Sequence, residues 1–114
     1  MDIGKFFTEI IMKYNKEMKG IKGIWLINDE LKIVAKYHGF TNFPLDELLR
    51  IIDKMSKIYR KEMEEVVLTL GGYSIYCRKM KNIFFISSFL YKTNLGFLRL
   101  MAQNIEEQLI SSTE

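Results

Sequence analysis

Few side chains in this sequence could do acid–base or nucleophilic chemistry. The 114 residues contain one histidine, His38, and one cysteine, Cys77. A serine or cysteine nucleophile needs a base beside it, and no serine lies in a Gly-x-Ser-x-Gly turn. A lone histidine defines no catalytic constellation. We therefore expect a structural or solvated His38, a strand position for Cys77 and a protein that is not an enzyme.

Metal and nucleotide sites are not expected either. A metal site usually takes about three or four protein ligands, and one histidine with one cysteine cannot supply that set. No Gly-x4-Gly-Lys-Ser/Thr loop occurs. Gly20 and Gly23 bracket a loop and Gly71-Gly72 form a hairpin turn, so neither pair opens a helix onto a phosphate. We expect no cofactor, and a nucleotide would belong to a partner.

Length, charge and composition narrow the function classes further. A chain of 114 residues fits one domain, which we expect to span residues 1–114 with a core at about 3–110. The 17 basic and 14 acidic residues give a net charge of +3, less than a nucleic-acid binder usually carries. No uncharged stretch is long enough for membrane insertion, and the N-terminus lacks a signal-peptide pattern. We expect a cytoplasmic protein without a nucleic-acid partner.

Hydrophobic periodicity predicts the order helix, two strands, helix, three strands, helix. Apolar residues recur at helical spacing from Ile3 to Met18 and stop before Gly20. Pro44 suits the first turn of the second helix. The first two predicted helices cover residues 3–18 and 45 to about 62. Thr93 or Asn94 caps the third, whose apolar stripe runs from Leu95 to Leu109, and the last four residues are expected to fray. The predicted strands cover residues 24–27, 31–37, 66–70, 73–80 and 83–90.

The composition of the strands indicates their places in the sheet. Residues 24–27 and 83–86 are apolar at every position, which favours a sheet with both faces covered by helices. Lys32 and Lys36 fit an outer strand that charge protects. The segment Val66–Leu70 is also expected at an edge, yet it has no charge or proline. An unprotected apolar edge usually has a partner.

The second helix has a wide apolar face. Its apolar positions span about 180°, against the roughly 100° stripe of an ordinary surface helix. Either this helix lies deep in a small core, or it forms a subunit interface together with residues 66–70. For the interface, the candidate residues are Leu48, Ile51, Met55, Ile58, Val66, Leu68 and Leu70.

A row of basic residues follows one side of the same helix. Its members are Arg50, Lys54, Lys57 and Lys61. The row is a solvated face if the aspartates one helical turn earlier pair with it, as the spacing of Asp53 and Lys57 favours. The alternative is a partner surface for an acidic protein or an anionic membrane.

The order and spacing of these segments resemble those of the roadblock/dynein light chain family, over roughly residues 6–109. In the second half, a strand, a Gly-Tyr turn, a strand with Arg78 and an apolar strand lead into NLGFLR. That hexapeptide is similar to the family's "anLGllr" entry to its last helix. The hairpin KGIWLINDELKIVAKY is similar to the family pattern "aallvdddGlvias", with Glu30 where a glycine is usual.

The resemblance implies an α/β (α+β) three-layer sandwich. Its five-stranded antiparallel sheet would have the order 2-1-5-4-3, with one helix on one face and two on the other. Family members dimerise through the second helix and the third strand, and they serve as platforms for Ras-like GTPases or as adaptor subunits. We therefore expect a homodimer that binds a small Ras-like GTPase. A structural adaptor without effect on nucleotide turnover and a small-molecule sensor domain are the alternatives.

Overall fold

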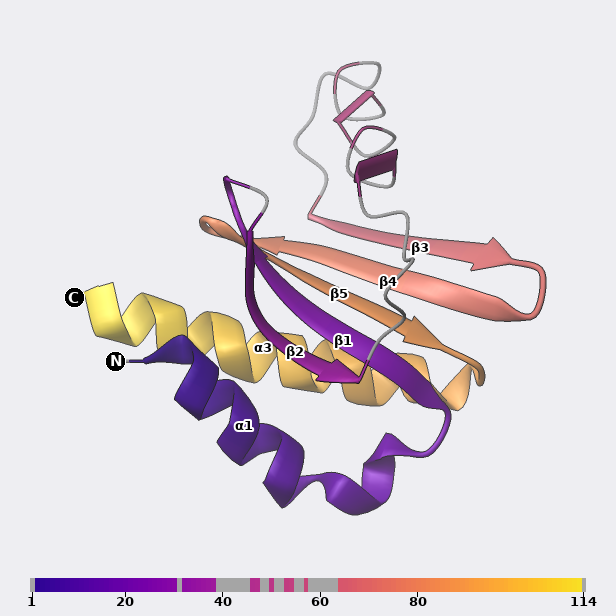
Figure 1. The fold of residues 1–114 in the computed structure, drawn as a ribbon, viewed down its shortest axis with the longest axis horizontal. Coiled ribbons are helices and arrows are strands. Elements are labelled where there is room, and N and C mark those ends of the chain that lie inside the picture. The colour runs from indigo at the N-terminus through magenta and orange to yellow at the C-terminus, as the bar shows by residue number, and fades with distance from the viewer. Residues whose placement is uncertain are drawn as a thin grey trace.

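The computed structural model describes residues 2–30, 32–38, 46, 47, 50, 53, 54, 57 and 64–113. In this part of the chain, two α-helices lie beside a five-stranded sheet (Figure 1). The helices are α1 (Ile3–Lys13) and α3 (Thr93–Thr113), and a 3-10 turn at Asn15–Met18 follows α1. The strands are β1 (Ile21–Asn28), β2 (Ile33–His38), β3 (Glu65–Leu70), β4 (Tyr73–Met80) and β5 (Ile83–Phe89).

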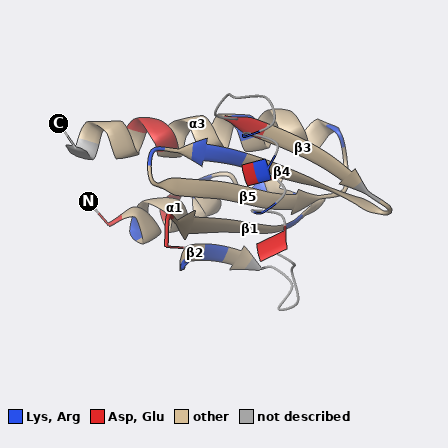
Figure 2. Cartoon of the chain, turned by 90° about the horizontal axis from the view of Figure 1, so that it is seen from above, with Lys and Arg blue, Asp and Glu red and all other residues tan. Residues whose placement is uncertain are grey.

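The sheet has the strand order that the resemblance implied. Neighbouring strands are antiparallel, in the order β2-β1-β5-β4-β3. β5 lies at the centre between β1 and β4 and has no charged residue (Figure 2). β2 and β3 lie at the two edges. The predicted places of the apolar strands and of the lysine-bearing strand are therefore confirmed.

The larger apolar cluster lies between the sheet and the two helices. α1 contributes Phe7 and Ile10, whose helical spacing turns both toward the sheet. The sheet and α3 contribute fully buried side chains, including Leu26, Phe85 and Met101. Removing this apolar surface from water is the main term that holds α1 and α3 against the sheet.

A second apolar cluster occupies the opposite face of the sheet. It consists of Trp25, Ile27, Val66, Ile75, Cys77 and Ile86. Both faces of the sheet therefore bury apolar side chains, as the continuous apolar runs predicted. The helix predicted at residues 45–62, and with it the third layer, lies largely outside the described residues.

Some predicted boundaries are wrong. The first helix ends at Lys13, and a 3-10 turn replaces its predicted last turn. Gly23 lies in β1 and pairs with Ser88, because Gly20 alone makes the reversal, with φ +91°. The main-chain N–H of Leu90 donates to the Gly20 carbonyl at 2.9 Å, which holds this reversal beside the end of β5. At the other end of the chain, α3 continues to Thr113 through the predicted frayed tail.

Candidate interaction surface

The outer edge of β3 is the first candidate surface. Among the described strands, β3 pairs only with β4. The N–H of Lys79 donates to the carbonyl of Glu64 at 2.9 Å, so the hydrogen-bonded pairs fall on the even-numbered residues of β3. The main-chain groups of Glu65, Val67 and Thr69 therefore point away from β4. These groups can receive another strand.

The side chains of β3 divide between the two faces of the sheet. Val66 is buried in the second apolar cluster, and the partly buried Leu68 packs against that cluster. Val67 lies on the other face and is 40% exposed. Leu70 ends the strand, and its side chain lies outside the description. Val66 and Leu68 are therefore adjacent to the edge, and their role in an interface stays a prediction.

A polar cluster connects β3 with β4 and α3. The Glu65 carboxylate accepts hydrogen bonds from the Tyr76 hydroxyl at 2.8 Å and from Nε and Nη2 of Arg99 at 2.8 and 2.6 Å. Burial raises the pKa of Glu65, but the hydrogen bonds from Arg99 and Tyr76 and the nearby guanidinium charges outweigh it, so the net shift is downward. The carboxylate therefore stays ionised and fastens the beginning of β3 to the helix.

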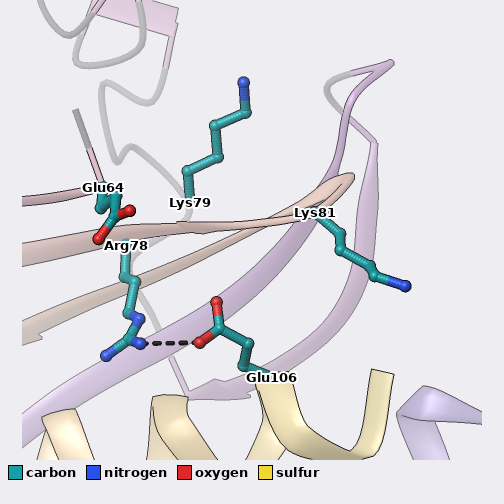
Figure 3. Close-up of a pocket in the computed structure, with 5 residues that line it drawn as sticks. All are labelled: Glu64, Arg78, Lys79, Lys81 and Glu106. Carbon is teal, nitrogen blue, oxygen red and sulfur yellow. Dashed lines mark hydrogen bonds and ion pairs between the residues drawn. The ribbon is translucent and has the colours of Figure 1, made fainter. Parts of the chain in front are cut away.

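A second ion pair lies beside a cavity of about 320 Å³ (Figure 3). Nη2 of Arg78 and Oε1 of Glu106 are 2.8 Å apart, and both side chains are about three-quarters buried. Lys79 and Lys81 also line the cavity but point away from this pair (Figure 3). Because Glu106 neutralises Arg78, we assign no anion site here.

Comparison with known proteins gives a clear answer for the fold. No family model matches the sequence, and no curated protein matches it. Among solved structures, Myxococcus xanthus MglB matches with a TM-score of 0.66 at 16% identity, over 94% of this chain and 96% of that chain. A Roadblock/LC7 domain from Streptomyces avermitilis matches with a TM-score of 0.61 at 10% identity, over 96% of this chain and 99% of that chain. This chain has the roadblock/LC7 fold.

A third solved structure also matches nearly the whole chain. The gliding protein MglB from Thermus thermophilus matches with a TM-score of 0.67 at 15% identity, over 94% of this chain and 87% of that chain. The TM-scores establish the fold, and at these low identities the binding partners are left to be tested. The resemblance on segment order and spacing is thereby confirmed at the level of the fold.

The candidate residues of the second helix are mostly not described in this roadblock fold. Arg50, Lys54 and Lys57 have helical backbone and exposed side chains. Nζ of Lys57 lies 3.0 Å from Oδ2 of Asp53, an exposed pair that fits a solvated face. The remaining candidates lie outside the described residues: Leu48, Ile51, Met55, Ile58 and Lys61.

Of the two chemistry-bearing residues His38 and Cys77, only Cys77 has a described side chain. Burial raises the pKa of the Cys77 thiol to about 12, so this thiol stays protonated near neutral pH. β2 ends at His38, whose side chain lies outside the description. Within the described ranges, no group of three or more His, Cys, Asp and Glu side chains could hold a metal ion. Neither described α-helix is long and apolar enough to cross a membrane.

The polar cluster around Glu65 is the feature that sequence reasoning missed. Its partners Tyr76 and Arg99 lie 11 and 34 residues further along the chain. No local motif connects these positions. The only available signal was an acidic residue at the start of a strand that is otherwise uncharged.

Proposed function

We propose that this chain is a non-enzymatic, cytoplasmic platform that binds a small Ras-like GTPase as a homodimer and modulates or recruits it. The observation that carries the proposal is the roadblock/LC7 fold, which MglB structures share over 94–96% of this chain. The buried Cys77 thiol stays protonated near neutral pH, so we assign it no role as a nucleophile.

The outer edge of β3 supports the dimer. Two copies can join their β3 edges about a twofold axis, because an antiparallel strand pair is compatible with that symmetry. The outward main-chain groups of Glu65, Val67 and Thr69 would form the new hydrogen bonds. Apolar side chains of the second helix would add buried area across the same axis, and we place Leu48, Ile51, Met55, Ile58, Leu68 and Leu70 there with Val66.

The effect on a GTPase would follow from binding alone. Arg78 and Arg99 both pair with carboxylates, at 2.8 and 2.6 Å. Neither guanidinium is therefore assigned to a transition state on the partner. A platform of this kind acts by binding one arrangement of the GTPase switch loops more tightly than another, since only differential affinity shifts a conformational population. The exposed Arg50, Lys54 and Lys57 are candidates for this contact.

The dimer is tested by paired charge substitutions. Ile51→Lys with Leu68→Lys should give a monomer by light scattering, because two lysines would be buried at the junction without partners. Val34→Lys is the control, since Val34 is exposed on β2 at the opposite edge of the sheet. Circular dichroism verifies that the double variant is folded. An unchanged oligomer would place the interface elsewhere.

The GTPase role is tested with purified small GTPases from the same source. Nucleotide hydrolysis and exchange are measured with the wild-type chain, with the double variant and without either. The proposal expects binding together with a changed rate or changed recruitment, both weaker for the double variant. Absence of binding and of any rate change for every such GTPase would refute it. Binding at unchanged rates, with pull-downs rich in other proteins, would favour the structural adaptor.

A further inference from the structure

A groove of about 410 Å³ lies between β3 and the beginning of α3. Val67 and Thr69 of β3 form one side, and Leu95 of α3 lies on the other. Leu90 and Lys92, from the segment that connects β5 to α3, also line it. α3 packs over β4 and β5 and reaches β3 through the Arg99–Glu65 ion pair, whereas Val67 and Thr69 further along β3 are exposed.

The groove exposes apolar surface that the roadblock fold does not itself cover. Val67 and Leu90 are each 40% exposed, and the adjacent Tyr91 is 49% exposed. Val67 and Leu90 come from two distant segments and line the same groove. Contiguous exposed apolar surface of this kind marks an interaction site, whereas single exposed apolar residues are ordinary.

Most of the charged side chains around this corner are basic. Lys92 is the only charged side chain among the described residues that line the groove. The hydrogen bond from Leu90 N–H to the Gly20 carbonyl, at 2.9 Å, brings the exposed Lys19 and Lys22 to the same corner, and the exposed Glu17 lies two residues before Lys19. The nearest acidic residue of β3, Glu65, is already bound by Arg99 and Tyr76. The rim is therefore basic and attracts acidic groups.

The groove is also held in shape before a partner arrives. The buried Asn94 accepts a hydrogen bond from Tyr91 N–H at 3.1 Å and donates to the Lys19 carbonyl at 2.8 Å, which fixes the entry to α3. Glu65 and Arg99 connect β3 with α3 further along the same strand and helix. Because the groove is preformed, less conformational entropy is lost when a partner binds.

We propose that this groove binds a peptide segment of a partner protein that combines apolar side chains with acidic ones. The apolar side chains would contact Val67, Leu90 and Leu95, and the acidic ones Lys92 and the lysines of the same corner. A concave groove can receive the side chain of a peptide, whereas a flat membrane surface would contact only its rim. The site adjoins the proposed dimer contact, because Val67 and Thr69 line the groove and their main-chain groups belong to that contact. The proposal does not depend on the GTPase proposal.

The probe is a random peptide library displayed on phage and selected against the full chain. Enriched sequences should combine apolar and acidic residues. A labelled copy of an enriched peptide should lose affinity on the order of tenfold with Lys92→Glu and with Val67→Asp, as expected when a charge contact or an apolar contact is removed. A peptide with its acidic residues changed to lysine should bind no better than background.

Two controls make the result decisive. Val34→Asp places the same charge on a side chain of similar exposure, 39%, on β2 and outside the groove, and should leave affinity unchanged. Melting curves and light scattering verify that Val67→Asp keeps its fold and oligomeric state, and the exposed Lys92→Glu serves if it does not. No enriched peptide, basic enriched peptides, or equal losses for Val34→Asp and Lys92→Glu would overturn the proposal. Binding to phosphatidylserine vesicles without peptide binding would also overturn it.

Discussion

Replacing Gly20 with alanine is expected to destabilise the corner where β1 begins and α3 starts. Gly20 has φ +91°, a conformation that side chains with a Cβ rarely adopt. An added Cβ would lie 2.5 Å from Cδ2 of Tyr91 and 2.6 Å from Oδ1 of Asn94. The half-exposed tyrosine ring can move aside. The buried Asn94 cannot move without losing its hydrogen bonds to Tyr91 N–H and to the Lys19 carbonyl.

The magnitude follows from these two contributions. A left-handed backbone costs a residue with a Cβ about 1–2 kcal/mol. Each of the two Asn94 hydrogen bonds contributes about 1 kcal/mol to the free energy of unfolding. Gly20→Ala should therefore lower the free energy of unfolding by about 3–4 kcal/mol. For a domain of this size the corresponding decrease in Tm is roughly 12–17 °C.

Urea denaturation and thermal melting measure the effect, and two other glycines separate its causes. Gly71 also has a positive φ, +49°, but no described atom lies within 4 Å of its added Cβ, so Gly71→Ala tests the backbone strain alone. Gly72 has neither feature among the described residues, and Gly72→Ala should stay within about 0.5 kcal/mol of wild type. If Gly20→Ala lost no more stability than Gly71→Ala, the contact with Asn94 would have no energetic role.

Three further substitutions or measurements test other parts of the structure. Because the hydrogen bonds from Arg99 and Tyr76 outweigh burial and lower the pKa of Glu65, its carboxylate stabilises the fold above its ordinary pKa, and this stability is lost as pH falls through the lowered pKa. In Glu65→Gln, the urea midpoint should therefore decrease less as the pH falls into the acidic range. An unchanged decrease would contradict the stabilising role of the Glu65 carboxylate. Gly96 is an exposed residue of α3, and no described atom lies within 4 Å of an added Cβ. Gly96→Ala should therefore raise the free energy of unfolding by about 0.5–1 kcal/mol in the same urea assay. A lower free energy of unfolding would indicate a contact at this position. The Cys77 thiol, with its pKa raised to about 12 by burial, should react with a thiol reagent far more slowly in the native protein than in urea, and equal rates would contradict its burial.

Residue patterns alone were enough to predict most of the elements and their order. A run that is apolar at every position requires cover on both faces, which is why residues 83–86 predicted a central strand. Lysines in and beside a strand are tolerated best at an edge, which is why Lys32 and Lys36 predicted the position of β2. The absence of charge from Val66 to Leu70 likewise indicated the β3 edge, and the dimer inferred from it stays a prediction.

Which distant side chains meet depends on the packed fold. Arg78 and Glu106 are 28 residues apart, and Glu65 and Arg99 are 34 residues apart. Their contacts depend on strand register and on how far α3 lies from β3, and local periodicity encodes neither quantity. The strand position of Gly23 also escaped prediction, because two nearby glycines offer equivalent breaks and only the pairing of Gly23 with Ser88 chooses between them. The groove beside β3 could not be predicted for the same reason. Periodicity shows which residues face a helix, whereas tertiary packing determines which of these residues the helix leaves exposed.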